Sequence, residues 1–317
     1  MRAVEAARLS PDGRLAVSAS KFGYNLMVWR VTDGTLLWEQ KQEAEIECVA
    51  FSPDGKRFAT GDENFLVRIW DTQRGKELKR LEHDSGLDGI AWSHDGQTIA
   101  AGSEKGDVWL WNADTYALAG KINAGSTVNS LDFNKEDSRL VVGGNIQTPV
   151  PQTGGKRYDG FVKLIDVPAR RVIREYKGPR GSVKSVRFSS DENLIATGGF
   201  DSTARLFETE TGRLLKTFEE PLRVEAIAFT PDSQYLLTGG HRSKISFYRL
   251  KDFALAYELP CPRTEYLDFS SDGRLLLTAH EESGLISLYI LISRIDDVPG
   301  AYHQLEGQLL QNRDLKK

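Results

Sequence analysis

Residues 46–55 read Ile46-Glu47-Cys48-Val49-Ala50-Phe51-Ser52-Pro53-Asp54-Gly55, and this stretch decides the fold. The hexamer 46–51 alternates enough to predict a β-strand. Ser-Pro-Asp-Gly predicts a tight turn, because Pro presets φ, Asp bonds the local backbone and Gly tolerates a positive φ. A second short strand follows at 57–60, and a third at 66–71 ends in Trp-Asp. After a turn at 72–75, a fourth strand at 76–81 completes the unit.

The same unit recurs seven times along the chain. The equivalent turns begin at Ser10, Ser52, Ser93, Asn134, Ser189, Thr230 and Ser270, with steps of 42, 41, 41, 55, 41 and 40 residues. A fixed period near forty residues indicates a repeat architecture, and four short strands per repeat describe one β-propeller blade. Because seven repeats take up nearly all 317 residues, the sequence predicts a single closed all-β body.

Period, turn and strand ending together resemble the WD-repeat β-propeller family over residues 3–291. The third strands end at Trp29-Arg30, Trp70-Asp71, Trp111-Asn112, Ile165-Asp166, Phe207-Glu208, Tyr248-Arg249 and Tyr289-Ile290. An aromatic residue at six of these seven endings suits a side chain wedged between neighbouring sheets. The resemblance implies a seven-bladed propeller of four-stranded blades over residues 1–292, and the Ser-Pro-Asp-Gly turns resemble those of bacterial members.

Blades of this family are often locked by a buried hydrogen-bond set of His, Ser or Thr, Asp and Trp. His83 matches the histidine that precedes a first strand, and Asp201 matches the aspartate between second and third strands, but they belong to different repeats. We therefore expect no complete set and structural roles for His83, Asp201, Trp29, Trp70 and Trp111. Packing of the aromatic endings should carry more of the stability.

The fourth repeat is longer than its neighbours by about fourteen residues, judged from the 55-residue step. The excess lies within 143–160, where Gly, Pro and polar residues predict a loop without regular structure. In the family this turn opens on the top face, beside the central channel. Two interpretations stay open: a flap that carries Lys156, Arg157 and Tyr158 over that face, or a tolerated surface insertion.

The two ends of the chain predict a problem of ring closure. WD-repeat propellers usually close when an N-terminal strand completes the last blade, whereas this sequence begins almost inside its first strand. Residues 293–317 are predicted as a separate tail, helical from 301, with Tyr302, Leu305 and Leu309 on one stripe. Either this tail covers the open blade or an upstream strand is missing. If these residues dock the tail on the first or last blade, deleting 299–317 should lower thermal stability.

Composition and motifs exclude several classes of function. Lys plus Arg (41) nearly balances Asp plus Glu (45), which favours neither nucleic acid nor an anionic membrane as partner. The longest apolar run, 285–292, is too short to span a bilayer, and no signal peptide is visible, so a cytoplasmic protein is expected. Two cysteines and five histidines show no ligand spacing, and no nucleophile or phosphate-loop motif occurs. We expect no metal, no cofactor and no catalysis.

The second residue of each first strand forms a mostly acidic series across the repeats: Glu5, Glu47, Asp88, Asn129, Lys184, Glu225 and Glu265. Acidic residues are normally depleted in strands. The resemblance places this position at the top-side mouth of the central channel. A ring of carboxylates there would attract cations or a Lys or Arg side chain, and crowding would raise some carboxylate pKa values.

A second series precedes the aspartate position between second and third strands: Phe22, Glu63, Glu104, Tyr158, Phe200, His241 and Glu282. The resemblance makes both series candidate contacts, with solvated loop ends as the less favoured alternative. The leading hypothesis is a non-catalytic protein–protein interaction scaffold that binds a basic peptide segment on the top face. The predicted contacts are Glu5, Glu47, Asp88, Glu225, Glu265, Phe22, Tyr158, Phe200 and His241.

Two alternatives to the scaffold hypothesis remain open. The first is a small-molecule or carbohydrate-binding protein, or an enzyme, that uses the central funnel with the fourth-repeat loop as a lid. The second is an assembly role through pairing at the open blade. The sequence does not decide the oligomeric state or the identity of the partner.

Overall fold

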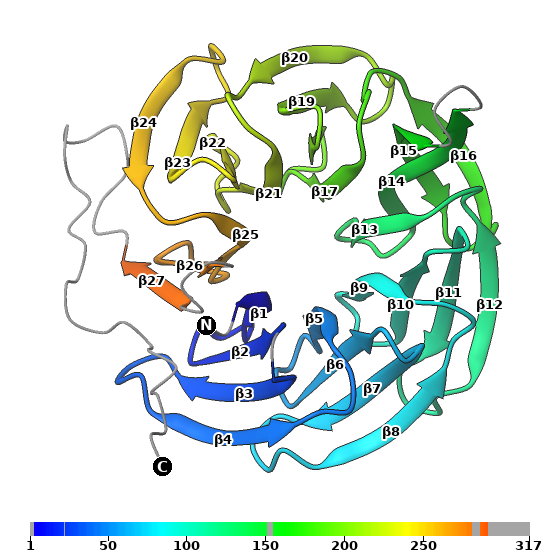
Figure 1. Cartoon of the computed structure of the whole chain (residues 1–317), viewed down its shortest axis with the longest axis vertical. Helices are drawn as coiled ribbons and strands as arrows, with labels where there is room; N and C mark the ends of the chain where they lie inside the picture. The colour runs from blue at the N-terminus through cyan, green and yellow to red at the C-terminus, as the bar shows by residue number, and fades with distance from the viewer. Residues whose placement is uncertain (1–2, 22, 151–154, 281–285, 291–317) are drawn as a thin grey trace.

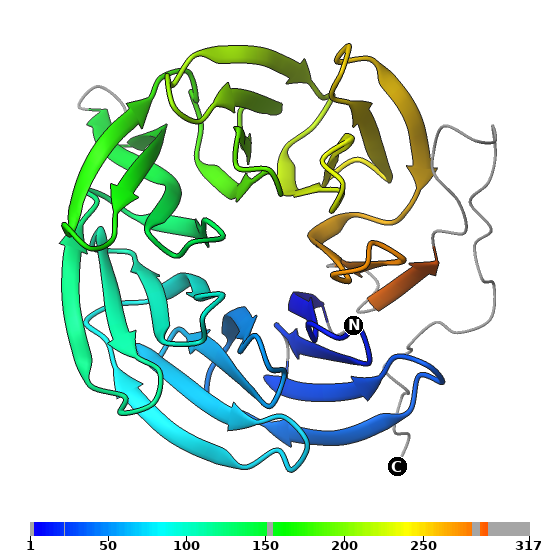
Figure 2. The ribbon, with the colours of Figure 1, turned by 180° about the vertical axis from the view of Figure 1, so that it is seen from behind.

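The computed structural model describes residues 3–21, 23–150, 155–280 and 286–290. All regular elements in these ranges are β-strands, grouped in seven antiparallel sheets around a central axis (Figure 1 and Figure 2). Six sheets have four strands in chain order, and the seventh has three described strands. The predicted all-β, seven-bladed propeller of four-stranded blades is confirmed. The predicted tail, with Tyr302, Leu305 and Leu309, lies outside the described residues.

The strands of the first four blades are β1 (Val4–Leu9), β2 (Leu15–Ser20), β3 (Asn25–Arg30), β4 (Leu36–Lys41), β5 (Ile46–Phe51), β6 (Arg57–Asp62), β7 (Leu66–Asp71), β8 (Glu77–Glu82), β9 (Leu87–Trp92), β10 (Thr98–Ser103), β11 (Asp107–Asn112), β12 (Leu118–Asn123), β13 (Val128–Phe133), β14 (Arg139–Val150), β15 (Gly155–Asp166) and β16 (Arg171–Tyr176). Those of the last three are β17 (Val183–Phe188), β18 (Leu194–Gly199), β19 (Thr203–Glu208), β20 (Leu214–Glu219), β21 (Val224–Phe229), β22 (Tyr235–Gly240), β23 (Lys244–Arg249), β24 (Leu255–Pro260), β25 (Thr264–Phe269), β26 (Leu275–His280) and β27 (Ile286–Ile290).

Each blade places its first strand at the axis, and the six blades with four described strands place the fourth on the rim (Figure 1). The inner strands are buried along most of their length, as β2 and β6 show, whereas β4 is almost wholly exposed. Strands covered on both sides need continuous apolar runs, which explains why the inner strands do not alternate strictly. We call the end at which the first strands begin the top face. The hairpins between second and third strands lie at this same end.

The Ser-Pro-Asp-Gly turns form as their chemistry predicts. Ser52 Oγ donates to Asp54 Oδ1 at 2.7 Å and accepts the Arg57 amide at 3.0 Å, while Asp54 Oδ1 accepts the Lys56 amide at 3.0 Å. Gly55 has a φ of 67°, a conformation that costs most other residues strain. The equivalent Ser–Asp or Thr–Asp bond recurs at Ser10, Ser93, Ser189, Thr230 and Ser270. These turns therefore fix the register of the first two strands in six blades.

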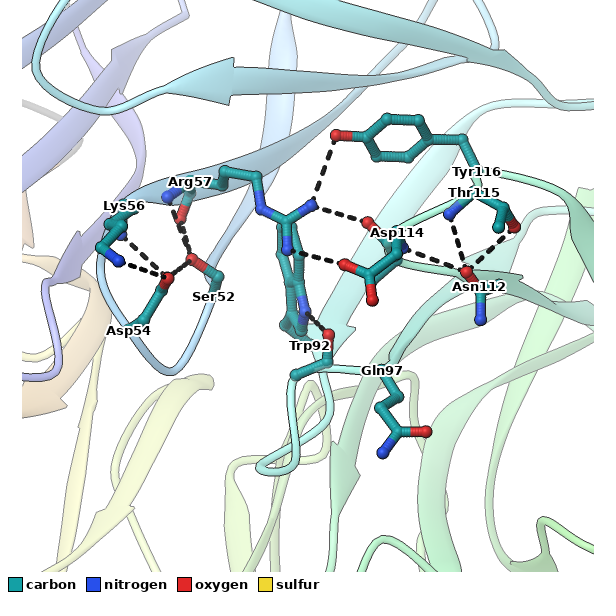
Figure 3. Close-up of polar contacts among 12 residues, drawn as sticks. Ser52, Asp54, Lys56, Arg57, Trp92, Gln97, Asn112, Asp114, Thr115 and Tyr116 are labelled. Atoms are coloured by element: carbon teal, nitrogen blue, oxygen red, sulfur yellow. Dashed lines mark hydrogen bonds and ion pairs between the residues drawn. The ribbon is translucent and has the colours of Figure 1, made fainter.

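Neighbouring blades pack through apolar side chains and through specific clamps. Phe58 of blade 2 lies between Trp38 and Trp70, with ring centroids 6.1 and 6.2 Å away. Figure 3 shows a polar clamp in which Arg57 of blade 2 reaches blade 3. Its guanidinium donates to the Ala113 carbonyl at 2.7 Å and lies 5.0 Å from the Trp92 ring centroid. It also approaches Asp114 and Tyr116 at 3.4 Å.

Blades 7 and 1 meet through direct packing. One buried apolar cluster combines residues of β1–β3 with residues of β26 and β27, including Val4, Met27 and Leu277. Across the same junction the Leu9 amide donates to Asp268 Oδ2 at 2.8 Å, and Ser271 Oγ donates to the Pro11 carbonyl at 2.8 Å. A shared apolar core and two hydrogen bonds thus join the first and last blades within the described residues.

The hydrogen-bond lock of the family is present only in pieces, as expected. Trp29 Nε1 donates to Ser18 Oγ at 2.9 Å and Trp70 Nε1 donates to Thr60 Oγ1 at 3.0 Å. His83 is buried, 4.3 Å from the Trp109 ring and 5.9 Å from that of Trp111, and burial lowers its pKa to about 4. Asp201 instead accepts from Thr203 Oγ1 at 2.7 Å and pairs with Arg205 at 2.8 Å. No described blade joins all four residue types in one set.

Blade 6 carries a substitute for this lock. Glu220 occupies the position that His83 holds in blade 3, and its Oε1 accepts from Thr238 at 2.7 Å and from the Tyr248 hydroxyl at 2.8 Å. Arg242 approaches the other carboxylate oxygen at 3.4 Å. Glu220 replaces the usual histidine and Arg242 the usual aspartate. The negative charge therefore lies at the histidine position and the positive charge at the aspartate position.

The prediction that the insertion of the fourth repeat is a loop without regular structure is wrong. β14 and β15 are twelve-residue strands whose pairing continues from Asn145↔Gly160 to Val150↔Gly155. The insertion is therefore a β-hairpin that lengthens blade 4 at the top face. Pro149 is tolerated because β14 pairs with β13 only as far as Gly144, so no third strand needs its missing N–H. Lys156 and Arg157 are tied to Gln147 and Asp159 of the same hairpin.

Candidate functional site

The seven position-equivalent residues of the first series converge on one cavity at the axis. Each comes from the innermost strand of a different blade, and together they line its upper part: Glu5, Glu47, Asp88, Asn129, Lys184, Glu225 and Glu265. The cavity volume is about 50 Å³, room for a few water molecules. We call these seven residues the channel mouth. Its five carboxylates are separated by more than forty residues between most neighbours in sequence, and only ring closure brings them together.

One side of the channel mouth contains a carboxylate cluster bridged by a lysine. Lys21 Nζ lies 3.2 Å from Glu5 Oε2 and 3.2 Å from Glu45 Oε1. Burial, followed by the charges of Glu5, Glu45 and Asp88, raises the pKa of Glu47 to about 9. Glu47 is therefore protonated at neutral pH in the absence of a further cation. Lys21 and Glu45 belong to neither sequence series. The only sequence signal for them is that both are expected in loops at the top face.

Lys184 and Asp88, from blades 5 and 3, form a second group at the channel mouth. Burial raises the pKa of Asp88, and the charge of Lys184 opposes that rise. Burial alone would lower the pKa of Lys184, but the carboxylates of Asp88, Glu225 and Glu47 raise it overall. The lysine is thus surrounded by a field that favours its charged form.

His241 belongs to a third group at the same mouth. Its Nε2 lies 3.2 Å from Glu225 Oε1 and 2.5 Å from the Arg263 guanidinium. Glu225, His241 and Glu265 have ligand atoms within 4.8 Å of one another, as do Glu5, Glu45 and Glu47, so each trio is spaced to hold a metal ion. Arg263 and Lys21 already bring positive charge to these two trios. These basic side chains reduce the negative charge that either trio offers to a further cation.

The aromatic residues of the second series lie in different surroundings. The Phe200 ring is covered by the Arg223 guanidinium, 4.2 Å from its centroid, and Lys184 Nζ lies 5.9 Å away. Tyr158 is 45% exposed on the long hairpin of blade 4, opposite Gln147. Phe22 lies outside the described residues. Phe200 thus joins the channel mouth through the cations that contact it, whereas Tyr158 belongs to the hairpin above the face.

The deeper part of the cavity has the opposite character. Arg8 and Arg187 line it, and Arg8 lies 4.8 Å above the Tyr266 ring centroid. Burial and the nearby charge of Arg8 lower the pKa of Arg187. Asp132 accepts the Phe188 amide of the next blade at 2.9 Å, as Asp268 accepts that of Leu9. A cation entering from the top therefore meets carboxylates first and guanidinium groups below them.

Comparison with known proteins supports this description of the repeats. The family model "WD domain, G-beta repeat" matches residues 33–71, 75–112, 170–208 and 212–249. The chain therefore contains WD40 repeats within a seven-bladed β-propeller. Because each match runs from a fourth strand to the end of the next third strand, one repeat unit spans two adjacent blades.

Three relatives illustrate the similarity. Eukaryotic translation initiation factor 3 subunit I of Phaeosphaeria nodorum is 39% identical over 83 residues, a quarter of each chain. WD repeat-containing protein SL1-17 of Schistosoma mansoni is 32% identical over 121 residues, 37% of this chain and 40% of the relative. The guanine nucleotide-binding protein subunit beta of Oryza sativa subsp. japonica is 32% identical over 133 residues, 38% of this chain and 32% of the relative.

The alignments thus cover between a quarter and two fifths of these relatives' length. The relatives are eukaryotic, so they do not support the predicted likeness to bacterial WD-repeat proteins. Among the residues that the structure describes, no helix has the length and apolar character needed to cross a membrane.

Proposed function

We propose that this protein is a non-catalytic interaction scaffold whose channel mouth binds a lysine- or arginine-rich segment of a partner protein. The observation that carries the proposal is the convergence of Glu5, Glu47, Asp88, Glu225 and Glu265 from five blades on one cavity. Carboxylates held together on a rigid scaffold are favourably placed to bind a cation. The free energy of folding has already overcome the repulsion between them, and a bound cation relieves it.

The charge balance at the channel mouth supports a cationic ligand. Lys21 bridges Glu5 and Glu45, and Lys184 faces Asp88, yet Glu47 still has a pKa raised to about 9. Burial, and after it the negative charge of the neighbouring carboxylates, keeps a proton on Glu47 at neutral pH, and an arriving positive charge would favour release of that proton. Binding of a basic side chain is therefore coupled to proton release from Glu47.

The kinds of protein that resemble this chain support a scaffold role. Two of the relatives are named as subunits, one of eukaryotic translation initiation factor 3 and one of a guanine nucleotide-binding protein. A subunit works through contacts with other chains. The similarity covers WD40 repeats only, so the identity of the partner is not carried over from these relatives.

The cavity argues against the alternative of a small-molecule or carbohydrate site. Its volume of about 50 Å³ is far below the roughly 300 Å³ at which pockets for drug-sized ligands begin. The expected lid is a paired hairpin, with Lys156 and Arg157 bound to neighbours on that hairpin. A single extended side chain fits this narrow cavity better than a sugar ring does.

The proposal is tested by the affinity of a capped, dye-labelled peptide of alternating lysine and glycine, measured by fluorescence anisotropy. The variant Glu47→Gln/Glu265→Gln removes two carboxyl groups from the mouth. Its control, Glu136→Gln/Glu175→Gln, removes two exposed carboxylates from a bottom turn and an outer strand. We expect about tenfold weaker binding for the mouth variant only, and weaker binding at ~200 mM than at ~50 mM salt. Equal affinities for both variants and wild type would contradict the proposal.

A further inference from the structure

Lys184 is the one basic residue of the channel mouth, at a position where five other blades carry a carboxylate. It is the second residue of β17, the innermost strand of blade 5, and it lines the same cavity as the five carboxylates. The protein therefore supplies a cation of its own, the Lys184 ammonium, to the axial cavity. In charge and in place it corresponds to the cation that the mouth is proposed to receive.

The contacts of Lys184 differ from those of Lys21, the other lysine at this site. Lys21 makes direct ion pairs with Glu5 and Glu45, both at 3.2 Å. Within the described ranges, by contrast, no carboxylate lies at ion-pair distance from the Lys184 ammonium. At neutral pH, where Glu47 carries a proton, the attraction comes from Asp88, Glu225 and Glu5 together. The ammonium is thus held by a diffuse field rather than by one partner.

The surroundings also give the Lys184 ammonium a second favourable neighbour. The Phe200 ring lies 5.9 Å from Nζ, within the range of a cation–π contact. The Arg223 guanidinium already covers this ring at 4.2 Å, which limits how closely the ammonium can approach it. Because the Lys184 ammonium has no direct ion pair to break, a small rotation of its flexible side chain away from the axis would still open the acidic mouth. Lys21 has no such freedom, because two carboxylates hold it.

We propose that Lys184 acts as a resident counter-cation that occupies the acidic channel mouth in the free protein and competes with the basic side chain of the partner. The proposal rests on the proposed function. It implies that Lys184 stabilises the unliganded propeller and, for the same reason, weakens its binding to cationic peptides. Lysine at this position thereby restricts binding to segments whose positive charge outweighs that of one internal ammonium.

Two measurements on Lys184→Met test the proposal. The control is Lys163→Met, which removes a lysine in a similar aromatic setting away from the mouth: its Nζ lies 5.1 Å from the Phe161 ring centroid and donates to the Ala124 carbonyl. Lys184→Arg serves as the charge-conserving variant. First, without ligand at neutral pH, Lys184→Met should lower the thermal midpoint, and the lysine–glycine peptide should restore it. An unchanged or raised midpoint would overturn the proposal.

Second, anisotropy with the same peptide should show about tenfold tighter binding to Lys184→Met, equivalent to ~1.4 kcal/mol. Lys163→Met should bind within about twofold of wild type, and Lys184→Arg, which keeps the positive charge, should bind the peptide more weakly than Lys184→Met does. If the peptide binds wild type through Glu47 and Glu265 but binds Lys184→Met no more tightly, this inference is wrong and the proposed function stands. If neither wild type nor Lys184→Met binds the peptide, both are wrong.

Discussion

Replacing Glu47 with glutamine should stabilise the propeller in a strongly pH-dependent way. The carboxyl group lies in the channel mouth, where burial and the charges of Glu5, Glu45 and Asp88 raise its pKa from 4.5 to about 9. Below pH 4.5 the group is protonated in both the folded and the unfolded protein, so the substitution should have little effect. Above that pH the unfolded chain ionises while the folded protein retains the proton, and wild-type stability falls.

The size of the effect follows from the shift. Each pH unit between 4.5 and about 9 costs the wild type ~1.4 kcal/mol, which sets a ceiling of ~3 kcal/mol at pH 7. The mouth opens to solvent, and water screens part of the repulsion, so we expect ~2 kcal/mol of stabilisation in Glu47→Gln. The gain should keep increasing toward pH 9 and then level off.

Equilibrium urea unfolding, followed by the fluorescence of the six tryptophans, measures this difference at several pH values. Glu136→Gln, at an exposed bottom turn, is the control and should stay within ~0.5 kcal/mol of wild type throughout. A stability gain that is the same at pH 4.5 and pH 8 would show that the charge environment of Glu47 is not the cause. A loss of stability at pH 8 would refute the reasoning outright.

Three further predictions concern the scaffold. Arg57→Ala should cost ~2 kcal/mol in urea unfolding because it removes the clamp between blades 2 and 3 (Figure 3), whereas Arg14→Ala, at an exposed turn, should cost almost nothing. His83 has a pKa of about 4 instead of 6.5, so wild type should lose up to ~3 kcal/mol relative to His83→Gln as pH falls from 6.5 to 4, and thermal melts over that range check this. Trp70→Phe and Thr60→Val should each destabilise by ~1 kcal/mol or more, and the double variant by less than the sum, since they share one hydrogen bond.

The sequence was sufficient for the architecture because the fold is encoded locally and repeatedly. A turn such as Ser52-Pro53-Asp54-Gly55 fixes a hairpin through bonds within five residues, and the same chemistry occurs in six blades. It was also sufficient to bring Glu47 and Glu225 into one cavity, since equivalent residues of a closed ring must face the same axis. In a closed ring of repeats, the position of a residue within its repeat determines its place relative to the central axis.

Other features depend on contacts that no repeat pattern contains. Lys21 and Glu45 pair across two loops, and the Glu220 lock of blade 6 uses residue types that the family pattern does not predict. The hairpin of blade 4 escaped prediction because Pro149 and its glycines suggested a loop, while backbone pairing along a two-stranded ribbon tolerates them. Arg8 and Arg187 were missed because the repeat alignment compared only one position of each first strand, and these two residues line the cavity below that position. Each of these requires three-dimensional proximity between residues of unrelated spacing.

The most direct test of the central claim is an affinity pull-down from native lysate with mass spectrometry. The bait proteins are wild type, Glu47→Lys/Glu225→Lys at the channel mouth, and Glu136→Lys/Glu175→Lys away from it, each shown to be folded by thermal melting. The two variants change net charge equally, so non-specific electrostatics affects both alike. We predict a partner with a basic segment that wild type and the outer control retain and the mouth variant loses. Retention of the same partners by all three proteins would contradict a binding role for the channel mouth.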